Sequence, residues 1–290
     1  MSQKALALDI GGTKIYNTIV DENGNICGEI EKHSTPKTID EFNILLKNIF
    51  SKYENDVDII AIATAGAVNN ENNKVISSTG NLPKGYNQIN FQALSNKKVF
   101  LENDANAAAW AEHILGASKN CPYSIILTLG TGVGGGIILN NKLYKGKSGG
   151  AGEMHFKMYA DKRRRCSCGS WDCFEAYASG TGLRKTAQEI LNNQNITTYD
   201  VIEGVKNGDE KMQQVFTKWQ DDILAGLIGL TNLFDPDCIV LSGSMAEFVD
   251  TNYLESSVNE EIVTTPIKVY RATAGNYSGM IGAALLAMSK

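Results

Sequence analysis

The chain has 290 residues and a formal net charge of −5, with 43% hydrophobic and 20% charged residues. This length has room for two domains with full hydrophobic cores. The negative charge argues against a nucleic-acid scaffold, and no apolar run reaches the roughly 20 residues of a membrane span. The first residues lead straight into a strand pattern without a secretory leader, so we expect a cytoplasmic protein with no nucleic-acid or membrane partner.

The first part of the chain alternates between strand and helix patterns. Residues 4–10 and 15–20 alternate as strands, and Asn23-Gly24 favours a hairpin turn into a third strand at 26–31. Apolar spacing predicts a helix over 39–53. The next expected elements are a strand at 57–63, short strands at 75–76 and 98–101, and a helix over 103–112.

The second part repeats the pattern of strand, Gly-Thr corner and strand at 123–129 and 133–139, which suggests an internal duplication. An irregular, glycine-rich and basic segment at 147–173 follows. We then expect helices at 174–179, 182–191, 199–206, 209–234, 251–261 and 277–288, with strands at 238–241 and 267–270. The expected domains are 1–116 and 117–275, with the C-terminal helix at 276–290 packing back on the first domain.

Two glycine-rich corners, at 9–14 and 129–136, indicate phosphate binding. Glycine has no Cβ, so backbone N–H groups can converge on an anion there. Thr13 and Lys14 add a hydroxyl and a positive charge. The spacing is not that of a P-loop. One such corner alone favours a plain hairpin turn, whereas two corners in two β units favour a pair of phosphate clamps.

Asp104 lies between these corners in sequence, at the start of an alanine-rich helix. The plain interpretation is a helix N-cap, because an Asp oxygen accepts a free N–H of the first turn. The flanking corners favour a second role, in which Asp104 is the general base that takes a proton from a sugar hydroxyl.

Three motifs together resemble the ROK family, which includes sugar kinases and related repressors. They are Asp9-Ile10-Gly11-Gly12-Thr13-Lys14, Leu129-Gly130-Thr131-Gly132-Val133-Gly134-Gly135-Gly136 and Cys166-x-Cys168-Gly169-x-x-x-Cys173-x-Glu175-Ala176-Tyr177-Ala178-Ser179-Gly180. The resemblance covers nearly the whole chain. It implies an α/β, actin-like ATPase (ribonuclease H-like) fold with two α/β domains around a cleft, ATP and Mg²⁺ as cofactors, and a homodimer.

The resemblance also implies phosphorylation of a hexose or an N-acylhexosamine. The segments 103–112 and 166–180 are most similar to N-acetylmannosamine kinases, which implies phosphate transfer from ATP to the C6 hydroxyl of N-acetylmannosamine. A glucokinase or another hexose kinase of the family is the alternative. A sugar-responsive, non-catalytic regulator is less favoured, because family repressors carry an N-terminal DNA-binding segment and the first strand here starts near Lys4.

Site residues follow from the resemblance, with Asp104 as the catalytic base. The implied sugar-binding residues are Asn81, Asn103, Asp104, Glu153, His155, Glu175 and Gly66. The implied ATP-binding residues are Asp9, Gly11, Gly12, Thr13, Lys14, Thr131, Gly132, Gly243 and Ser244, with Asp9 acting on Mg²⁺ directly or through water. The loop at Ala65-Gly66 lacks the Pro-Gly of many glucokinases, so its small side chains leave room for a 2-acetamido group.

Three of the six cysteines, Cys166, Cys168 and Cys173, fall within eight positions, which favours a metal over a disulfide. Relatives supply a histidine three residues after the sugar-loop glutamate as a fourth zinc ligand. That position is Phe156 here, and His155 is one residue early, so we expect no bound zinc. The alternative is that the backbone adjusts and His155 becomes the ligand. The basic run at 162–165 is expected to be a solvated loop.

Overall fold

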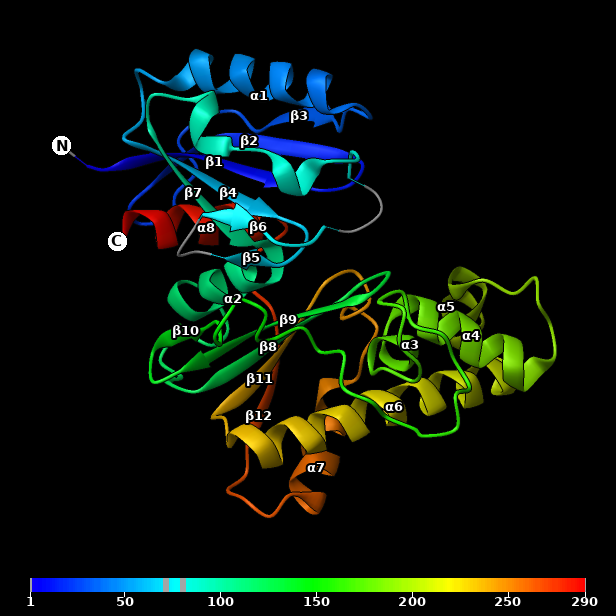
Figure 1. The fold of residues 1–290 in the computed structure, drawn as a ribbon. Helices are drawn as coiled ribbons and strands as arrows, with labels where there is room; N and C mark the ends of the chain where they lie inside the picture. The colour runs from blue at the N-terminus through cyan, green and yellow to red at the C-terminus, as the bar shows by residue number, and fades with distance from the viewer. Residues whose placement is uncertain (1, 70–72, 79–81, 290) are drawn as a thin grey trace. The chain divides into compact units, whose positions relative to one another are not determined.

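The computed structural model describes residues 2–69, 73–78 and 82–289 (Figure 1). The chain forms two compact units. The first comprises residues 1–120, 136–152 and 273–290, and the second comprises 121–135 and 153–272. Residues 136–152 therefore cluster with the first unit, whereas the boundaries predicted from the sequence assign them to the second. No helix in the described ranges is both long and apolar enough to cross a membrane.

The first unit is built on a five-stranded sheet of order β3-β2-β1-β4-β7. Its three N-terminal strands form an antiparallel meander, and β4 and β7 run parallel to β1. Because β4 is buried along its whole length, it is a continuous apolar run, as expected for an inner parallel strand. The strands are β1 (Lys4–Ile10), β2 (Lys14–Asp21), β3 (Glu31–Ser34), β4 (Ile59–Thr64) and β7 (Lys98–Asn103).

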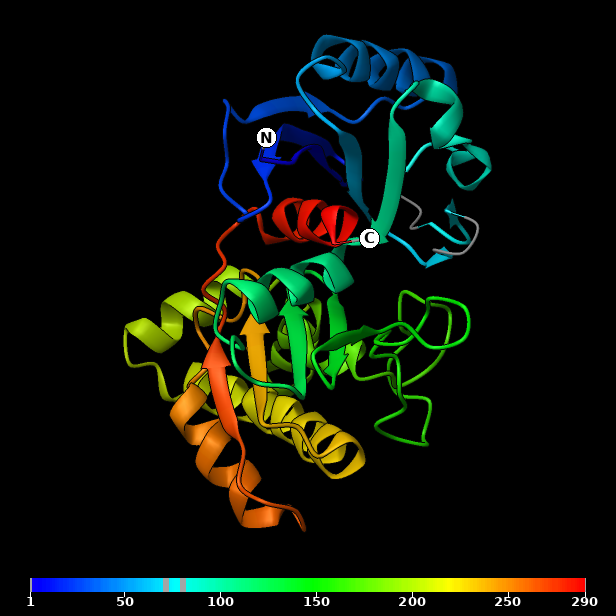
Figure 2. The same ribbon diagram turned by 90° about the vertical axis from the view of Figure 1, so that its left-hand side faces the viewer.

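Helices cover both faces of this sheet (Figures 1 and 2). Alternation along β1 turns Leu6 and Leu8 toward α1 (Ile39–Tyr53), and Ala5 and Ala7 toward α8 (Ser278–Met288). The alanines let α8 lie close to the sheet. A Cβ at Gly282 of α8 would fall 1.8 Å from the carbonyl oxygen of Ala107, so glycine is required where α8 meets α2 (Asp104–Ile114).

The third strand lies later in the sequence than predicted. Ile26 makes only an isolated bridge to Val20, and regular pairing with β2 resumes at Glu31–Ser34. The chain bulges between these points, where the Thr18 hydroxyl donates to the carbonyl oxygen of Gly28. The prediction of a strand at 26–31 was therefore wrong, because residues 27–30 leave the pairing with β2 and the strand begins only at Glu31. The remaining short elements of this region are β5 (Val68–Asn69), β6 (Lys74–Val75), η1 (Tyr86–Gln88) and η2 (Phe91–Leu94).

The second sheet has the order β10-β9-β8-β11-β12, with β11 parallel to β8 and to β12. This order repeats that of the first sheet, which supports the suggested duplication. The turn between β9 and β10 has left-handed conformations at Asn140 and Asn141, as a tight hairpin requires. These strands are β8 (Ser124–Leu129), β9 (Val133–Leu139), β10 (Lys142–Tyr144), β11 (Cys238–Ser242) and β12 (Lys268–Arg271).

Helices of the second unit pack around α6, the longest of those described. The indole of buried Trp219 on α6 donates to the carbonyl oxygens of Ala178 and Ser179 at 3.1 Å, which holds the corner between α3 and α4. Asp235, in the left-handed conformation before a proline, ends α6 as predicted. The helices are α3 (Glu175–Ala178), α4 (Gly180–Leu191), α5 (Thr198–Lys206), α6 (Glu210–Phe234) and α7 (Thr251–Glu261).

Candidate active site

The predicted site residues of the first unit meet at the carboxyl edge of its sheet. Ile10 of β1 pairs with Thr64 of β4, and Thr64 pairs with Asn103 of β7. The three parallel strands therefore end level with one another. The first glycine corner, the Gly66 loop and the start of α2 follow these ends directly. Ligands of open α/β sheets bind at this edge.

Asn103, not Asp104, is the N-cap of α2. Its side-chain oxygen accepts the backbone N–H of Asn106 at 3.0 Å, and its amide donates to the carbonyl oxygen of Gly66 at 3.0 Å. The plain interpretation of Asp104 as the cap is therefore wrong. Asp104 is the first helical residue, and its Oδ1 accepts the N–H of Ala105 at 2.9 Å.

Gly66 is held in a conformation that only glycine suits. Its φ is +101°, and a Cβ there would lie 2.0 Å from the carbonyl oxygen of Ser77. Because Asn103 donates to the Gly66 carbonyl, this tight loop fixes the residue next to Asp104. Two of the predicted sugar-binding residues are thus joined directly.

Asp9 and Asp104 form a pair of neighbouring carboxyl groups. Burial, and to a smaller extent the negative charge of Asp104, raise the pKa of Asp9 from its ordinary value to about 7. Burial also raises the pKa of Tyr86, whose hydroxyl lies 2.6 Å from Thr64 Oγ1, and both aspartates add to that shift. A close pair of carboxylates in such an environment suits a divalent cation or a shared proton. Sequence reasoning missed Tyr86 and Thr64, since neither belongs to a motif.

The first glycine corner is braced from the side. Gly11 donates its N–H to the carbonyl oxygen of Lys14 at 3.0 Å, and the hydroxyl of Thr35 donates to the carbonyl oxygen of Gly11 at 2.7 Å. The side chains of Thr13 and Lys14 are exposed, and Gly12 is half-buried. The corner is therefore fixed in shape while its hydroxyl and ammonium groups face solvent.

The second glycine corner lies at the carboxyl edge of the second unit. Gly130 donates to the carbonyl oxygen of Gly132 at 2.9 Å, and Gly180 donates to the carbonyl oxygen of Gly130 at 2.8 Å. The Thr181 hydroxyl donates to the carbonyl oxygen of Thr131 at 2.8 Å. The N-terminus of α4 therefore lies beside this corner, where it favours an anion. Sequence reasoning did not assign this role to α4, although Ser179 before the helical run was a readable capping signal.

The loop at Gly243 and Ser244 lies against the same corner. Ser242 pairs with Thr128 across β11 and β8, so both strands end together. Gly243 has a φ of +86°, and a Cβ there would lie 2.4 Å from the carbonyl oxygen of Leu129. The predicted ATP-binding residues of this unit are therefore brought together.

Glu175 lies between the second corner and the cysteine cluster. Its Oε2 accepts the N–H of Val133 at 3.0 Å, and its Oε1 accepts from Cys166 Sγ at 3.4 Å. A Cβ at Gly132 would lie 2.4 Å from Oε2. Glu175 thus makes direct contact with the glycine corner. The sequence predicted Glu175 only as a sugar-binding residue and did not predict this contact.

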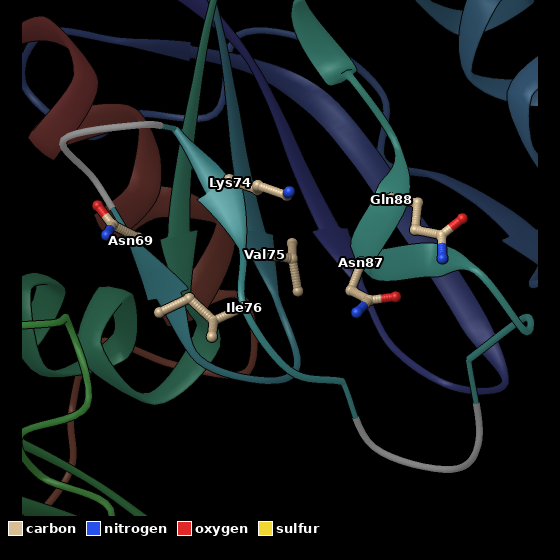
Figure 3. Close-up of a pocket in the computed structure, with 6 residues that line it drawn as sticks. All are labelled: Asn69, Lys74, Val75, Ile76, Asn87 and Gln88. Carbon is tan, nitrogen blue, oxygen red and sulfur yellow. The ribbon is translucent and has the colours of Figure 1, made fainter.

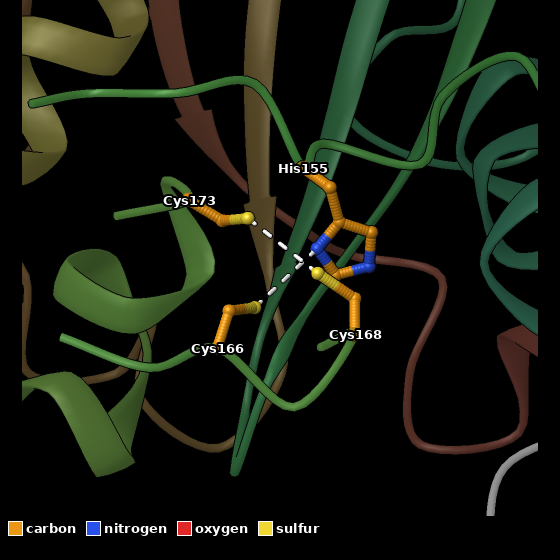
Figure 4. A group of neighbouring side chains, drawn as sticks. All are labelled: His155, Cys166, Cys168 and Cys173. Atoms are coloured by element: carbon orange, nitrogen blue, oxygen red, sulfur yellow. Dashed lines mark hydrogen bonds between the residues drawn. The ribbon is translucent and has the colours of Figure 1, made fainter. Parts of the chain in front are cut away.

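The side chains of His155, Cys166, Cys168 and Cys173 converge (Figure 4). All four ligand atoms lie within 4.8 Å of one another, with Cys168 Sγ 3.5 Å from Cys173 Sγ and His155 Nδ1 3.8 Å from Cys166 Sγ. Sulfur ligands of a tetrahedral zinc are about 3.7 Å apart, given Zn–S bonds of about 2.3 Å. The donor set and its spacing fit structural zinc, which favours the alternative that the backbone adjusts and His155 becomes the ligand over the expectation of no bound zinc.

The displaced register around His155 has a packing reason. Phe156, at the position where relatives carry histidine, stacks on Phe174 with ring centroids 4.9 Å apart. The Phe174 N–H also donates to the carbonyl oxygen of Phe156 at 2.9 Å. His155 Nε2 lies 3.7 Å from the Glu153 carboxylate, so one ring nitrogen faces the sulfurs and the other a carboxylate. Metal-bound histidines commonly have this arrangement.

The basic run at 162–165 is exposed, as predicted, at Lys162, Arg163 and Arg165, but it is buried at Arg164. The side chain of Arg164 is 5% exposed, donates to Thr186 Oγ1 at 3.0 Å and pairs with Glu189. Its guanidinium also lies 4.4 Å from the Tyr177 ring centroid. Arg165 lies over the Trp171 ring. The charge of Arg164 is therefore buried within the second unit, which the run of basic residues in the sequence does not reveal.

A separate hollow in the first unit lies between the β5–β6 hairpin and η1 (Figure 3). It is lined by Asn69, Lys74, Val75, Ile76, Asn87 and Gln88. These side chains offer amides and one cation but no acid or nucleophile, so the hollow carries none of the expected chemistry. Asn81, predicted to bind sugar, lies outside the described residues.

Comparison with known proteins agrees with this geometry. A family model described as ROK family matches residues 5–290. A glucokinase of Streptomyces coelicolor is 33% identical over 97% of this chain and 96% of its own length. An N-acetylmannosamine kinase of Yersinia pseudotuberculosis is 32% identical over 98% of each chain. The crystal structure of a ROK family glucokinase from Streptomyces griseus in complex with glucose and AMPPNP has a TM-score of 0.79 and 29% identity, covering 100% of each chain.

The two α/β units, with their repeated sheet order and glycine corners, have the actin-like ATPase fold of ROK kinases. The chain belongs to the ROK family. The resemblance found in the three sequence motifs is thereby confirmed.

Proposed function

We propose that this protein is an ATP-dependent sugar kinase that phosphorylates the C6 hydroxyl of N-acetylmannosamine. Family membership and full-length kinase relatives support the sugar-kinase class. The observation that carries the proposal is the position of Asp104 at the start of α2, beside Asp9 and next to the Asn103–Gly66 hydrogen bond.

The acceptor half of the reaction uses the first unit. Asp104 accepts the proton of the C6 hydroxyl as its oxygen attacks the γ-phosphorus of ATP. The new O6–P bond forms in line as the bond to the β-phosphate oxygen breaks, and ADP leaves. Because the transition state is loose, positioning and charge neutralisation supply most of the catalysis. Asn103 and Gly66 position the sugar, and Asn81, Glu153, His155 and Glu175 complete the proposed set of sugar-binding residues.

The donor half uses the two glycine corners. Backbone N–H groups of Gly11, Gly12, Thr131 and Gly132 hold the phosphates in this proposal, with Thr13 and Lys14 adding a hydroxyl and a charge. Gly243 and Ser244 lie on the nucleoside side. Asp9 would hold Mg²⁺ directly or through water, and the ion would supply positive charge to the phosphates. The S. griseus complex with AMPPNP supports a nucleotide triphosphate as donor.

Zinc, where bound, has a structural role. It would be held by His155, Cys166, Cys168 and Cys173. The proposed phosphate transfer does not use it as a Lewis acid. The ring of His155 would then be fixed, and with it the neighbouring Glu153 carboxylate. This arrangement orders one side of the proposed sugar pocket.

The acetamido sugar is proposed over glucose because the loop at Ala65-Gly66 has only small side chains. Glucokinase is the second candidate, since a glucokinase relative is as similar in sequence as an N-acetylmannosamine kinase relative. The homodimer and the cytoplasmic location stay expectations from the sequence.

A coupled assay of ADP release tests the proposal with N-acetylmannosamine, N-acetylglucosamine, mannose and glucose. We expect kcat/KM to be at least tenfold higher for N-acetylmannosamine than for each other sugar. Preference for glucose would replace the proposed acceptor, and no turnover of any sugar would reject a kinase altogether. NMR of the phosphorylated product identifies the hydroxyl that is modified.

A further inference from the structure

An ion pair between Lys145 and Glu102 lies beside the start of α2, and neither residue belongs to the proposed catalytic or binding residues. The two side chains are in direct contact, and they are 21% and 1% exposed. Glu102 is the penultimate residue of β7, so it directly precedes Asn103 and Asp104. Lys145 directly follows β10 and opens the loop 145–152, after which Glu153 comes in sequence.

The carboxylate of Glu102 braces the first turn of α2. While Oε2 meets Lys145, Oε1 accepts the backbone N–H of Asn103 at 3.1 Å and the side-chain amide of Asn106 at 3.4 Å. These contacts lie on either side of Asp104 in sequence. Any shift of the Glu102 carboxylate therefore moves the backbone that carries the proposed base.

The loop that begins at Lys145 is held at two further points. The N–H of Ala151 donates to the carbonyl oxygen of Lys145 at 3.2 Å, which closes the loop on itself. Gly149 packs so closely on β5 that a Cβ there would lie 1.9 Å from the carbonyl oxygen of Val68. Val68 is two residues from Gly66, the acceptor for the Asn103 amide. The loop 145–152 and the start of α2 therefore contact the same short segment, residues 66–68.

We propose that the Lys145–Glu102 ion pair positions Asp104 for the acceptor hydroxyl, because it holds the carboxylate that supports the start of α2 and ties the loop 145–152 to it. This inference rests on the proposed function, which assigns Asp104 to the proton. Lys145 and Glu102 are positioning residues, since they act through Asp104 and the loop. Buried ion pairs contribute little net stability, whereas misplacement of a reacting group by about 1 Å can cost 100-fold in rate.

The test uses three variants of the full chain and the sugar that the wild-type enzyme phosphorylates best. Lys145→Met removes the charge and keeps the apolar stem, and Lys145→Arg restores a cation. Lys147→Met is the matched control, because Lys147 is an exposed lysine of the same loop. We expect Lys145→Met to lower kcat/KM for the sugar 10- to 100-fold and to leave the KM for ATP within twofold of wild type. Lys145→Arg should recover at least a third of the wild-type value.

Glu102→Gln/Lys145→Met controls for folding, because it removes the negative charge of Glu102 together with the positive charge of Lys145. It should show the same kinetic loss with a melting temperature near wild type, and it replaces Lys145→Met if that variant does not fold. Equal kinetics of Lys145→Met and Lys147→Met, or of the double variant and wild type, would overturn the inference alone. A wild-type chain that phosphorylates no sugar would overturn the proposed function and this inference with it.

Discussion

The negative charge of Asp104 raises the pKa of Asp9, so the two carboxylates repel one another in the folded protein. Burial is the larger cause of this shift, which brings the pKa of Asp9 to about 7. A buried carboxyl group beside a second carboxylate favours binding of a cation. The raised pKa of Asp9 therefore agrees with the proposal that Asp9 acts on nucleotide-bound Mg²⁺.

The pH dependence of stability should reveal the buried Asp9. A carboxyl group whose pKa is raised on folding binds its proton more tightly in the folded state, so stability falls as pH rises from about 4 through 7. Relative to Asp9→Asn, the wild-type free energy of unfolding should drop by roughly 2–4 kcal/mol between pH 4 and pH 8. Urea unfolding of both proteins at several pH values without Mg²⁺ or nucleotide measures this difference.

Asp40→Asn is the control for this measurement, because Asp40 is an exposed acid in the first turn of α1. Its stability should follow the wild-type curve at every pH. Parallel curves for wild type and Asp9→Asn would mean that Asp9 titrates near its ordinary pKa.

Replacing Asp104 by asparagine should stop phosphate transfer while leaving the fold and sugar binding intact. The amide keeps the shape of the side chain but cannot take the proton, and general bases contribute roughly 10²- to 10⁴-fold. We expect kcat to fall by at least 100-fold with the sugar Kd, measured by calorimetry, within threefold of wild type. Asp40→Asn serves again as the control, and turnover of Asp104→Asn near the wild-type rate would exclude the base role.

Metal analysis should find one zinc per chain in protein purified without added zinc. Three thiolates and one imidazole nitrogen at the observed spacing form a closed structural site. His155→Ala and Cys173→Ser should each lose the metal. Phe156→Leu should keep it, because Phe156 packs on Phe174 and does not face the sulfurs. Zinc-free wild-type protein, or retention of zinc by His155→Ala, would contradict this assignment.

Arg164 should contribute more to stability than its neighbour Arg163. Arg164→Ala removes a buried guanidinium and leaves Thr186 Oγ1 and the carbonyl oxygen of Ala176 without their donor. We expect a loss of about 2–3 kcal/mol in the free energy of unfolding. Arg163→Ala, at an exposed side chain, should unfold close to wild type. Equal urea midpoints for the two variants would show that the Arg164 contacts are not stabilising.

Much of the fold was readable because strand and helix periods are local properties. The helix over 39–53 and the end of α6 at Asp235 were predicted, since each depends on neighbouring residues. The bulge at Gly28 and the burial of Arg164 were not, because distant segments decide them.

By itself, the sequence determined most of the strands and helices along the chain, the two glycine corners and the position of Asp104 directly after β7. These features depend on residue type and local spacing. Only the tertiary structure decided that Asn103 caps α2, that His155 rather than Phe156 joins the cysteines, and that Lys145 meets Glu102. Each of these depends on which side chain fills a space made by segments far apart in the chain. A shift of one residue, as between His155 and Phe156, changes which side chain joins the cysteines, although the three-cysteine motif is the same.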